Sequence, residues 1–269
     1  MPIVDAHHHF WRAGAQHQSW RPADTPELER DFESAELAPL MAEAGVDTTV
    51  LVEHVDEQAE NVRLREYATS PFVAGVVAWL PLNDPPTALA ELGRFDASFR
   101  GVRFLIGRNP LAWLTNSDTL DVLRELAARS LTWDVVVLSD EQAAQVCAVA
   151  ERLPSLRIVV CHLARPPLGS GTWDGWTARL DRLASYPNVA LKVSVGLDVL
   201  TSWEWSGDEL APCVEHAVST FGTERCMLAS NWPVILLRRG YVESWTELAS
   251  AVSHDPNVLG ATATHWYRL

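Results

Sequence analysis

Ile158-Val159-Val160-Cys161-His162 is the stretch that decides the fold, because a run of four apolar residues ends abruptly at a histidine. A continuously apolar run of this length is typical of a parallel strand that is covered on both faces. The stretch Val135-Val136-Val137-Leu138 shows the same pattern about twenty residues earlier. Parallel strands of this kind indicate an α/β protein, in which strands and helices alternate along the chain.

Runs of this kind recur along the chain, and each is followed by a segment with helical periodicity. We predict eight strands, at residues 3–7, 48–53, 73–79, 101–105, 133–138, 157–161, 189–194 and 225–230. Eight strand and helix pairs close naturally into a (β/α)8 TIM barrel, whose active site lies at the carboxyl ends of the strands. An open doubly wound sheet is the competing fold. No linker or repeat interrupts the sequence, so we expect a single barrel domain over residues 1–269.

Helix ends support this division of the chain. An apolar stripe that includes Leu37 and Met41 stops at Gly45, a residue type favoured just after a helix. Ser139 and Gln142 have the spacing of a capping box, which predicts a helix that starts there and stops at Pro154.

Composition excludes several classes of function. The 269 residues carry a net charge of −14 and no basic run, which argues against binding nucleic acid through its phosphates. Neither a charged leader nor a run of 18 apolar residues is present, so we expect a cytoplasmic protein without a membrane partner. The cysteines lack the paired short spacing of zinc ribbons, and we interpret them as reduced core thiols: Cys147, Cys161, Cys213 and Cys226.

The first predicted strand ends in three histidines, in the order Ile3-Val4-Asp5-Ala6-His7-His8-His9. Side chains alternate between the two faces of a strand, so His7 and His9 point the same way and can share one ion, while His8 points the other way. Neutral imidazole is a common ligand of zinc and related metals. The pattern therefore predicts a metal site, and a merely polar strand end is the alternative.

Polar residues stand at or near the ends of most other predicted strands. Because the carboxyl ends of barrel strands meet at one face, we expect these side chains to share a pocket. Chance alone also places polar residues where strands leave the core, which is the structural alternative for each of them. The residues in question are Glu53, His54, Arg103, Asp140, His162, Lys192, Ser194 and Asn231.

Four motifs resemble the amidohydrolase superfamily, and within it the branch of sugar lactonases and 2-pyrone-4,6-dicarboxylate lactonase. They occur in the order expected for that branch, and the last residues, 261–269, are similar to its final helix. The motifs are Asp5-Ala6-His7-His8-His9-Phe10-Trp11, Gly101-Val102-Arg103, Cys161-His162-Leu163-Ala164-Arg165-Pro166-Pro167 and Ala229-Ser230-Asn231-Trp232-Pro233-Val234.

This resemblance implies an enzyme that opens a small cyclic ester with water. It places His7, His9 and His162 around the substrate carbonyl or a metal, and it matches Arg103 and Lys192 to substrate-binding positions. The strand-one pair favours one divalent ion, zinc or manganese, although some members of the family work without metal. The implied partner is a small-molecule substrate.

The chain departs from the family pattern at the position of its usual aspartate after strand eight, where it carries Asn231. An amide cannot accept a proton at neutral pH, so Asn231 is predicted to donate a hydrogen bond to a developing oxyanion instead. We therefore predict Glu53 as the base, with a pKa raised by its apolar surroundings, and Asp140 as the second choice. An ion pair between Glu53 and Arg103 is the structural alternative.

Other departures fall at Cys161, Arg165, Leu138, Asp140 and Phe104, and they indicate a rebuilt pocket. Aromatic loop residues suit a ring-shaped or partly apolar ligand less acidic than a pyrone dicarboxylate. Among them Trp11 and Trp232, together with Asp140, are the predicted substrate contacts.

Two alternatives to hydrolysis remain open from the sequence. One is a lyase or isomerase of the same fold, with Glu53 and His162 as acid and base. The other is a ligand-binding relative that has lost catalysis. A homodimer is a further expectation, because the apolar and aromatic helices around a barrel often form such interfaces.

Overall fold

The structure is a computed structural model that describes residues 1–169 and 172–269. Eight parallel strands form one sheet in the order of the sequence. They are β1 (Val4–His8), β2 (Thr48–Val52), β3 (Val73–Trp79), β4 (Phe99–Arg103), β5 (Thr132–Val136), β6 (Arg157–Cys161), β7 (Val189–Val193) and β8 (Cys226–Leu228).

Residues just beyond β8 join it to β1. The Asn231 amide donates to the His7 carbonyl at 2.9 Å, and the His9 amide donates to the Trp232 carbonyl at 2.8 Å. These bonds bring the two ends of the sheet together, so the predicted barrel is confirmed and the open doubly wound sheet is excluded.

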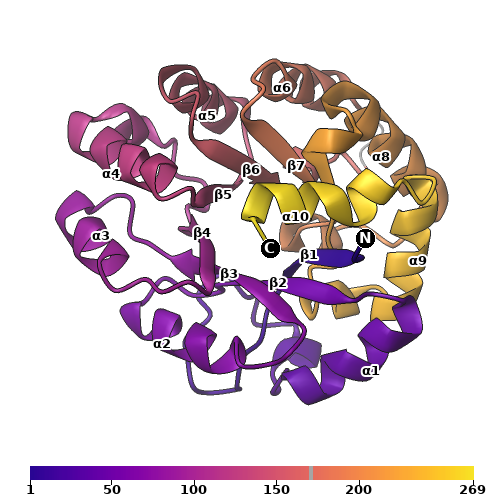
Figure 1. The fold of residues 1–269 in the computed structure, drawn as a ribbon. Helices are drawn as coiled ribbons and strands as arrows, with labels where there is room; N and C mark the ends of the chain where they lie inside the picture. The colour runs from indigo at the N-terminus through magenta and orange to yellow at the C-terminus, as the bar shows by residue number, and fades with distance from the viewer. Residues whose placement is uncertain (170–171) are drawn as a thin grey trace.

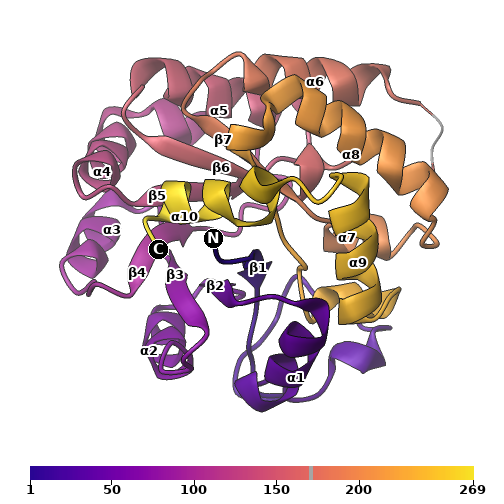
Figure 2. The ribbon, with the colours of Figure 1, turned by 45° about the vertical axis from the view of Figure 1, so that its right-hand side comes forward.

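Helices surround the barrel, as Figures 1 and 2 show from two directions. They are α1 (Ser34–Ala44), α2 (Gln58–Tyr67), α3 (Pro85–Leu92), α4 (Ser117–Ala128), α5 (Asp140–Arg152), α6 (Asp174–Ala184), α7 (Leu197–Leu200), α8 (Gly207–Phe221), α9 (Tyr241–Ala251) and α10 (Thr262–Tyr267). None of the described helices is long and apolar enough to cross a bilayer.

The predicted helix ends agree with the structure. Gly45 follows α1 in the left-handed conformation, with φ 71°. The Ser139 hydroxyl accepts a hydrogen bond from the Gln142 amide at 3.2 Å and so caps α5, which ends just before Leu153 and Pro154. All four cysteines are buried free thiols, as expected.

The last strand is shorter than predicted, because the chain leaves it before Ser230. The Ser230 amide and hydroxyl donate to the buried Asp5 carboxylate at 2.9 and 2.6 Å, and the Tyr241 hydroxyl contacts the same carboxylate at 3.3 Å. Burial raises the pKa of Asp5 to about 6, although these hydrogen bonds oppose the shift. A side chain of the first strand thus holds the residues that follow the last strand.

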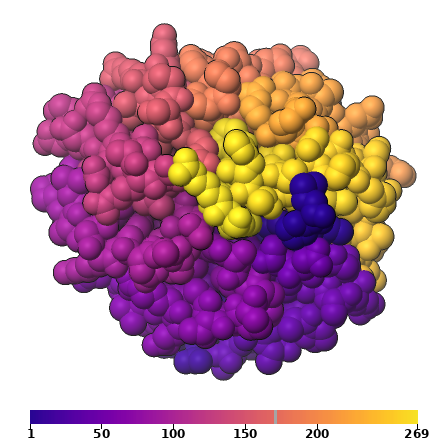
Figure 3. Space-filling model, viewed as in Figure 1, coloured from indigo at the N-terminus to yellow at the C-terminus, as the bar shows by residue number. Residues whose placement is uncertain are grey.

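The amino-terminal end of the barrel is closed by the C-terminal segment. In Figures 1 and 2, α10 crosses this end beside the N terminus, and in Figure 3 C-terminal residues cover the middle of the same face. Trp266 and Tyr267 pack there against barrel residues that include Val4, Val50 and Val159. Any access to the barrel interior must therefore be sought at the opposite end.

Candidate active site

A cavity of about 360 Å³ lies at the carboxyl ends of the strands. Its walls come from residues at or just after seven of the eight strands. The lining comprises His9, Trp20, His54, Arg103, Phe104, Leu105, Ile106, Gly107, Arg108, Val136, Leu138, His162, Gly196, Leu197, Asp198, Asn231 and Val234. The cavity therefore occupies the place where barrels of this kind hold their active sites.

The strand-one histidines meet as the alternation of side chains predicted. Nε2 of His7 and Nε2 of His9 lie 3.2 Å apart, whereas His8 contacts the Thr49 hydroxyl at 2.8 Å instead. Nδ1 of His9 lies 2.8 Å from the Val52 carbonyl, so it carries the proton and leaves a lone pair on Nε2. Burial and nearby cations lower the pKa of His7 and of His9 well below the usual range.

Lys192 lies beneath this pair and is completely buried. Its ammonium is 2.7 Å from the Asp134 carboxylate and 3.1 Å from Nδ1 of His7. Asp134 also accepts from the Tyr267 hydroxyl at 2.6 Å. Since a lysine ammonium can only donate, Nδ1 of His7 is the acceptor and Nε2 carries the proton, which it donates to His9. Lys192 is not among the residues lining the cavity, so the structure places this predicted substrate contact one layer below it.

Glu53 and Arg103 form the buried ion pair that was the structural alternative for Glu53. Nε of Arg103 donates to the Glu53 carboxylate at 2.7 Å, and the same guanidinium also donates to the Glu53 carbonyl. Arg103 lines the cavity, but Glu53 does not. Burial, partly opposed by Arg103, raises the pKa of Glu53 to about 8. The structure thus places the predicted base behind an arginine and outside the cavity lining.

His162 begins a left-handed turn at the carboxyl end of β6. His162, Leu163 and Ala164 have φ values of 56°, 53° and 49°, a conformation that costs about 1–2 kcal/mol per residue. The turn is held from α6, where Trp176 donates to the Leu163 carbonyl at 2.8 Å and Arg179 donates to the Ala164 carbonyl at 3.0 Å. This strained turn directs the His162 ring into the cavity lining.

Two neighbours fix the His162 ring. Nδ1 lies 2.8 Å from the Ser194 hydroxyl on the strand-seven side, and the ring centroid is 4.7 Å from that of His7. A Cβ at Gly196 would lie 3.3 Å from the His162 Cβ, so the chain approaches His162 closely at this glycine. Burial lowers the pKa of His162 well below the usual range, with Arg103 and Lys192 adding to the shift, and the imidazole is neutral at pH 7.

Asn231 also lines the cavity, and its backbone has the left-handed conformation, with φ 56°. Its amide group donates to the Val195 carbonyl at 2.9 Å, which fixes the orientation of the side chain. The second amide hydrogen is left for a ligand, as the predicted oxyanion role requires.

The remaining predicted contacts lie outside the cavity lining. Trp232 is fully buried between Phe10 and Phe32, with ring centroids 6.0 and 5.4 Å away. Trp11 packs behind His54, at 5.3 Å between ring centroids. Asp140 pairs with Arg179 at 2.8 Å on the surface of α5, with 70% of its side chain exposed. Trp11 and Trp232 are thus buried behind the site, and Asp140 lies away from it at the start of α5.

Trp20 and His54 also line the cavity, although the sequence assigned neither of them a catalytic or binding role. Trp20 comes from the loop after β1, and its ring nitrogen donates to the His54 carbonyl at 2.5 Å. His54 directly follows Glu53, and it is His54 whose side chain lines the cavity. Its position at a strand end was the available signal, but the sequence does not reveal which of the two adjacent residues faces inward.

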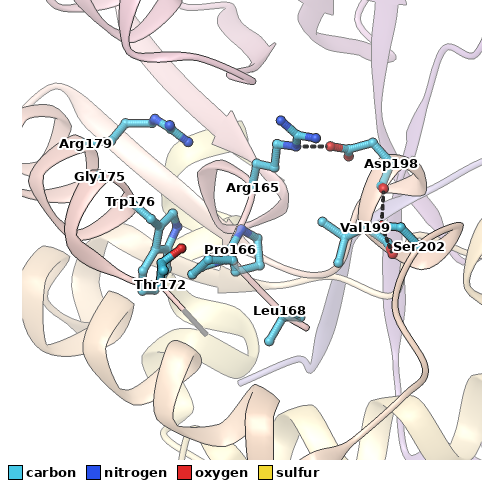
Figure 4. A pocket seen from close by; sticks show the side chains of 11 residues that line it. Arg165, Pro166, Leu168, Thr172, Gly175, Trp176, Arg179, Asp198, Val199 and Ser202 are labelled. Carbon is cyan, nitrogen blue, oxygen red and sulfur yellow. Dashed lines mark hydrogen bonds and ion pairs between the residues drawn. The ribbon is translucent and has the colours of Figure 1, made fainter. Parts of the chain in front are cut away.

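A second hollow of about 400 Å³ lies beside the His162 turn (Figure 4). Asp198 lines both hollows and pairs with Arg165 between them. The arginines lining this second hollow, Arg165 and Arg179, are both in ion pairs, the latter with Asp140. The described residues that line the second hollow include no histidine or asparagine, whereas the first hollow has both, and we assign the active site to the first.

Histidines, an arginine and an asparagine gathered at the carboxyl end of a (β/α)8 barrel define the active-site architecture of a barrel hydrolase. The amidohydrolase family model matches residues 4–268, and the chain belongs to that family. It is 32% identical to L-fucono-1,5-lactonase of Burkholderia ambifaria, over 99% of this chain and 95% of the relative. It is 29% identical to L-fucono-1,5-lactonase of Burkholderia multivorans, over 99% and 96% of the two chains. The predicted resemblance to lactonases of this superfamily is confirmed.

A crystal structure of an amidohydrolase from Burkholderia multivorans with bound zinc superposes with a TM-score of 0.89 and 28% identity, over the whole of both chains. A related protein therefore binds zinc. In the present chain the His7 and His9 nitrogens, at 3.2 Å, have the separation of two ligands on one zinc ion, for which about 3.3 Å is expected at usual bond lengths.

The chemistry of the donor set does not fit a resident divalent cation. Nε2 of His7 carries a proton, because Nδ1 accepts from Lys192, and Nη1 of Arg103 lies 3.3 Å from the same nitrogen. The Lys192 and Arg103 side chains thus both lie against the His7 ring. Within residues 1–169 and 172–269, no group of three histidine, cysteine or carboxylate side chains is arranged to hold a metal.

Proposed function

We propose that this protein hydrolyses the ring ester of a small, uncharged lactone of the sugar-lactone class. The observation that carries the proposal is a cavity at the strand ends in which His162, Asn231 and Arg103 face an apolar wall. Full-length similarity to two L-fucono-1,5-lactonases supports the choice of reaction and of the first substrate to test.

The character of the cavity favours an uncharged substrate. Most of the remaining wall is apolar, and it includes Phe104, Leu105, Ile106, Leu138 and Leu197. The buried Arg103 already donates to both the carboxylate and the carbonyl of Glu53, so it has fewer free donors for a substrate carboxylate. A lactone with an apolar substituent on its ring would match this surface better than a pyrone dicarboxylate.

In the proposed reaction, water adds to the lactone carbonyl and the ring C–O bond then breaks, which gives a hydroxy acid. The neutral His162 ring and the free Asn231 amide hydrogen stabilise the negative charge that develops on the carbonyl oxygen. Removing one donor of this kind from an enzyme costs about 2.7 to 4 kcal/mol of transition-state stabilisation. Arg103 adds positive charge at the cavity wall.

We further propose that hydrolysis does not require a metal. The His7 and His9 rings would then form a hydrogen-bonded chain from Lys192 to the cavity wall. Polarisation along this chain would carry part of the positive field of Lys192 to the cavity. The tautomers support this role, because every contact in the chain joins a donor to an acceptor. Lys192 donates to Nδ1 of His7, Nε2 of His7 donates to Nε2 of His9, and Nδ1 of His9 donates to the Val52 carbonyl.

The test is a product assay on purified protein with L-fucono-1,5-lactone, related neutral aldonolactones and 2-pyrone-4,6-dicarboxylate. We expect a product heavier than the neutral lactone by one water, with no carbon dioxide, and slower turnover of the dicarboxylate. Carbon dioxide release or a product of unchanged mass would instead support the lyase or isomerase alternative. Binding of the lactones without turnover would support the inactive relative.

Cytoplasmic location and a homodimer are further proposals. The first is supported by the acidic composition and the reduced, buried cysteines. The homodimer is supported only by the general use of barrel helices as interfaces. Size-exclusion chromatography with light scattering tests it by measuring the molar mass of the protein in solution.

A further inference from the structure

His54 and Glu60 form a buried pair at the wall of the cavity that the proposed reaction has so far not used. Nδ1 of His54 lies 2.8 Å from a Glu60 carboxylate oxygen, and both side chains are only 1% exposed. His54 follows β2, whereas Glu60 lies in the first turn of α2, so the pair joins a strand end to the following helix.

The Glu60 carboxylate is held in its charged form. It accepts from the His54 backbone amide at 3.1 Å and from the Gln16 amide group at 2.6 Å. Burial alone would raise the pKa of Glu60, but His54 and these hydrogen bonds hold it below the usual range. A carboxylate beside Nδ1 favours a proton on that nitrogen, which in the neutral ring leaves the lone pair on Nε2.

The imidazole is also fixed in position. The Trp11 ring packs beside it at 5.3 Å between centroids with an interplanar angle of 34°, and Trp20 donates to the His54 carbonyl. Nε2 is buried and has no hydrogen-bond partner among the described residues, although the ring lines the cavity; Nδ1 lies close to Glu60 without the geometry of a hydrogen bond. A buried acceptor without a partner costs about 1–3 kcal/mol, so its presence at a cavity wall points to a ligand or water that it binds.

We propose that His54 is the general base of the lactone hydrolysis and that Glu60 is its positioning residue. This inference rests on the proposed function. Nε2 accepts a proton from water as the water oxygen bonds to the carbonyl carbon, and the imidazolium formed is stabilised by the Glu60 carboxylate. When the ring C–O bond breaks, the leaving alkoxide takes a proton from the imidazolium, which restores neutral His54 and gives the hydroxy acid.

Other candidates for the base fit less well. The Glu53 carboxylate is held by Arg103 outside the cavity lining, and Asn231 has no basic atom. His9 has a free lone pair on Nε2, but this atom receives the His7 proton at 3.2 Å. His54 is the lining histidine whose second nitrogen lies 2.8 Å from a carboxylate, and a carboxylate in this position orients the catalytic base in other hydrolases.

The test compares wild type with His54→Gln, His54→Ala and Glu60→Gln on the best lactone substrate. We expect His54→Gln to lower kcat by about 10²- to 10⁴-fold with KM changed by less than about threefold. Added imidazole should raise the kcat of the His54→Ala variant by at least about tenfold, with saturation at high imidazole concentration, because imidazole fills the space of the missing ring. His17→Ala removes an exposed histidine and serves as the matched control, with unchanged turnover.

Glu60→Gln tests the positioning role separately. We expect kcat to fall by about tenfold or more, and nitrogen NMR of the His54 ring to show loss of the Nδ1-protonated tautomer. A purely structural role would lower stability without changing the tautomer.

The outcomes separate the two proposals. If wild type hydrolyses none of the lactones, the proposed function fails. If wild type is active and His54→Gln keeps kcat within threefold, or imidazole leaves a folded His54→Ala variant inactive, only the role of His54 is overturned.

Discussion

The two ends of the barrel are built from the same eight strands but from opposite kinds of side chain. At the amino-terminal end, Val4, Val50, Val159 and Met227 pack against Trp266 of α10, and the surface is closed. At the carboxyl end, imidazoles, an arginine and an amide line a cavity. The difference indicates that buried apolar contacts at the amino-terminal end stabilise the fold. The carboxyl end carries polar groups that can bind a ligand.

A layer of charge separates the two ends. Lys192 and Asp134 lie fully buried between them, tied below to Tyr267 and above to His7. The contact with Tyr267 links the last helix to the histidines of the first strand through two side chains. Substitutions in this layer should therefore affect both ends, whereas those on either side should affect only one.

The largest effect is expected for Lys192→Met, which leaves the Asp134 carboxylate buried without its cation. Breaking a buried pair in this way destabilises a protein by about 3–5 kcal/mol. Urea unfolding measures the change. The double variant Lys192→Met/Asp134→Asn removes both charges and should recover part of the stability; equal stability of wild type and the single variant would contradict a shared charge layer.

His162→Ala is expected to affect the upper end alone. It should lower kcat by about 10²- to 10³-fold, the loss typical of one oxyanion donor, with little change in melting temperature. Trp266→Ala is the contrasting variant at the lower end, with a loss of about 3–5 kcal/mol in unfolding free energy and unchanged kcat per folded molecule. A fully active His162→Ala variant would contradict the assignment of the active site.

Asp5 gives a smaller effect that depends on pH. Its pKa is raised from 3.8 to about 6, so between these values the folded protein binds the proton more tightly than the unfolded chain. Protonation of Asp5 contributes up to about 3 kcal/mol to the free energy of unfolding. This contribution is fully present below pH 3.8 and is lost as the pH rises through 6. Asp5→Asn should therefore gain stability relative to wild type between pH 4 and 7, as measured by urea unfolding at each pH. A constant difference across that range would refute the shift.

The smallest effect is expected from metal removal. Because Lys192 and Arg103 already supply positive charge beside His7, a chelator should change kcat/KM by less than about twofold. Elemental mass spectrometry of the purified protein, repeated on a His7→Ala/His9→Ala variant, checks this. About one zinc or manganese ion per chain, lost in the variant together with activity, would show that the two histidines form a metal site after all.

Most of the fold could be predicted because its signals are local. Continuous apolar runs identified the strands, and Gly45 and Ser139 identified helix ends, since a strand period or a capping bond involves residues only a few positions apart. The end of β8 was missed because it depends on Asp5, more than 220 residues away in the sequence.

The site was predicted in outline only. His162, Asn231, Arg103 and His9 line the cavity, but Trp232 and Asp140 lie outside its lining. Whether a loop residue turns inward depends on helices that pack behind it, as Arg179 of α6 holds Asp140 at the surface. That information is not contained in the residue and its neighbours along the chain.

The sequence by itself determined the alternation of strands and helices, the family, and the shared face of His7 and His9, because these follow from periodicity and from motifs of adjacent residues. The tertiary structure alone decided that His54 lines the cavity and Glu53 does not. Arg103 from β4 holds the Glu53 carboxylate, whereas Glu60 from α2 and Trp11 from the loop after β1 orient the His54 ring beside the cavity. The physical reason is that protonation and access at one residue are set by charges and rings that only folding brings into contact.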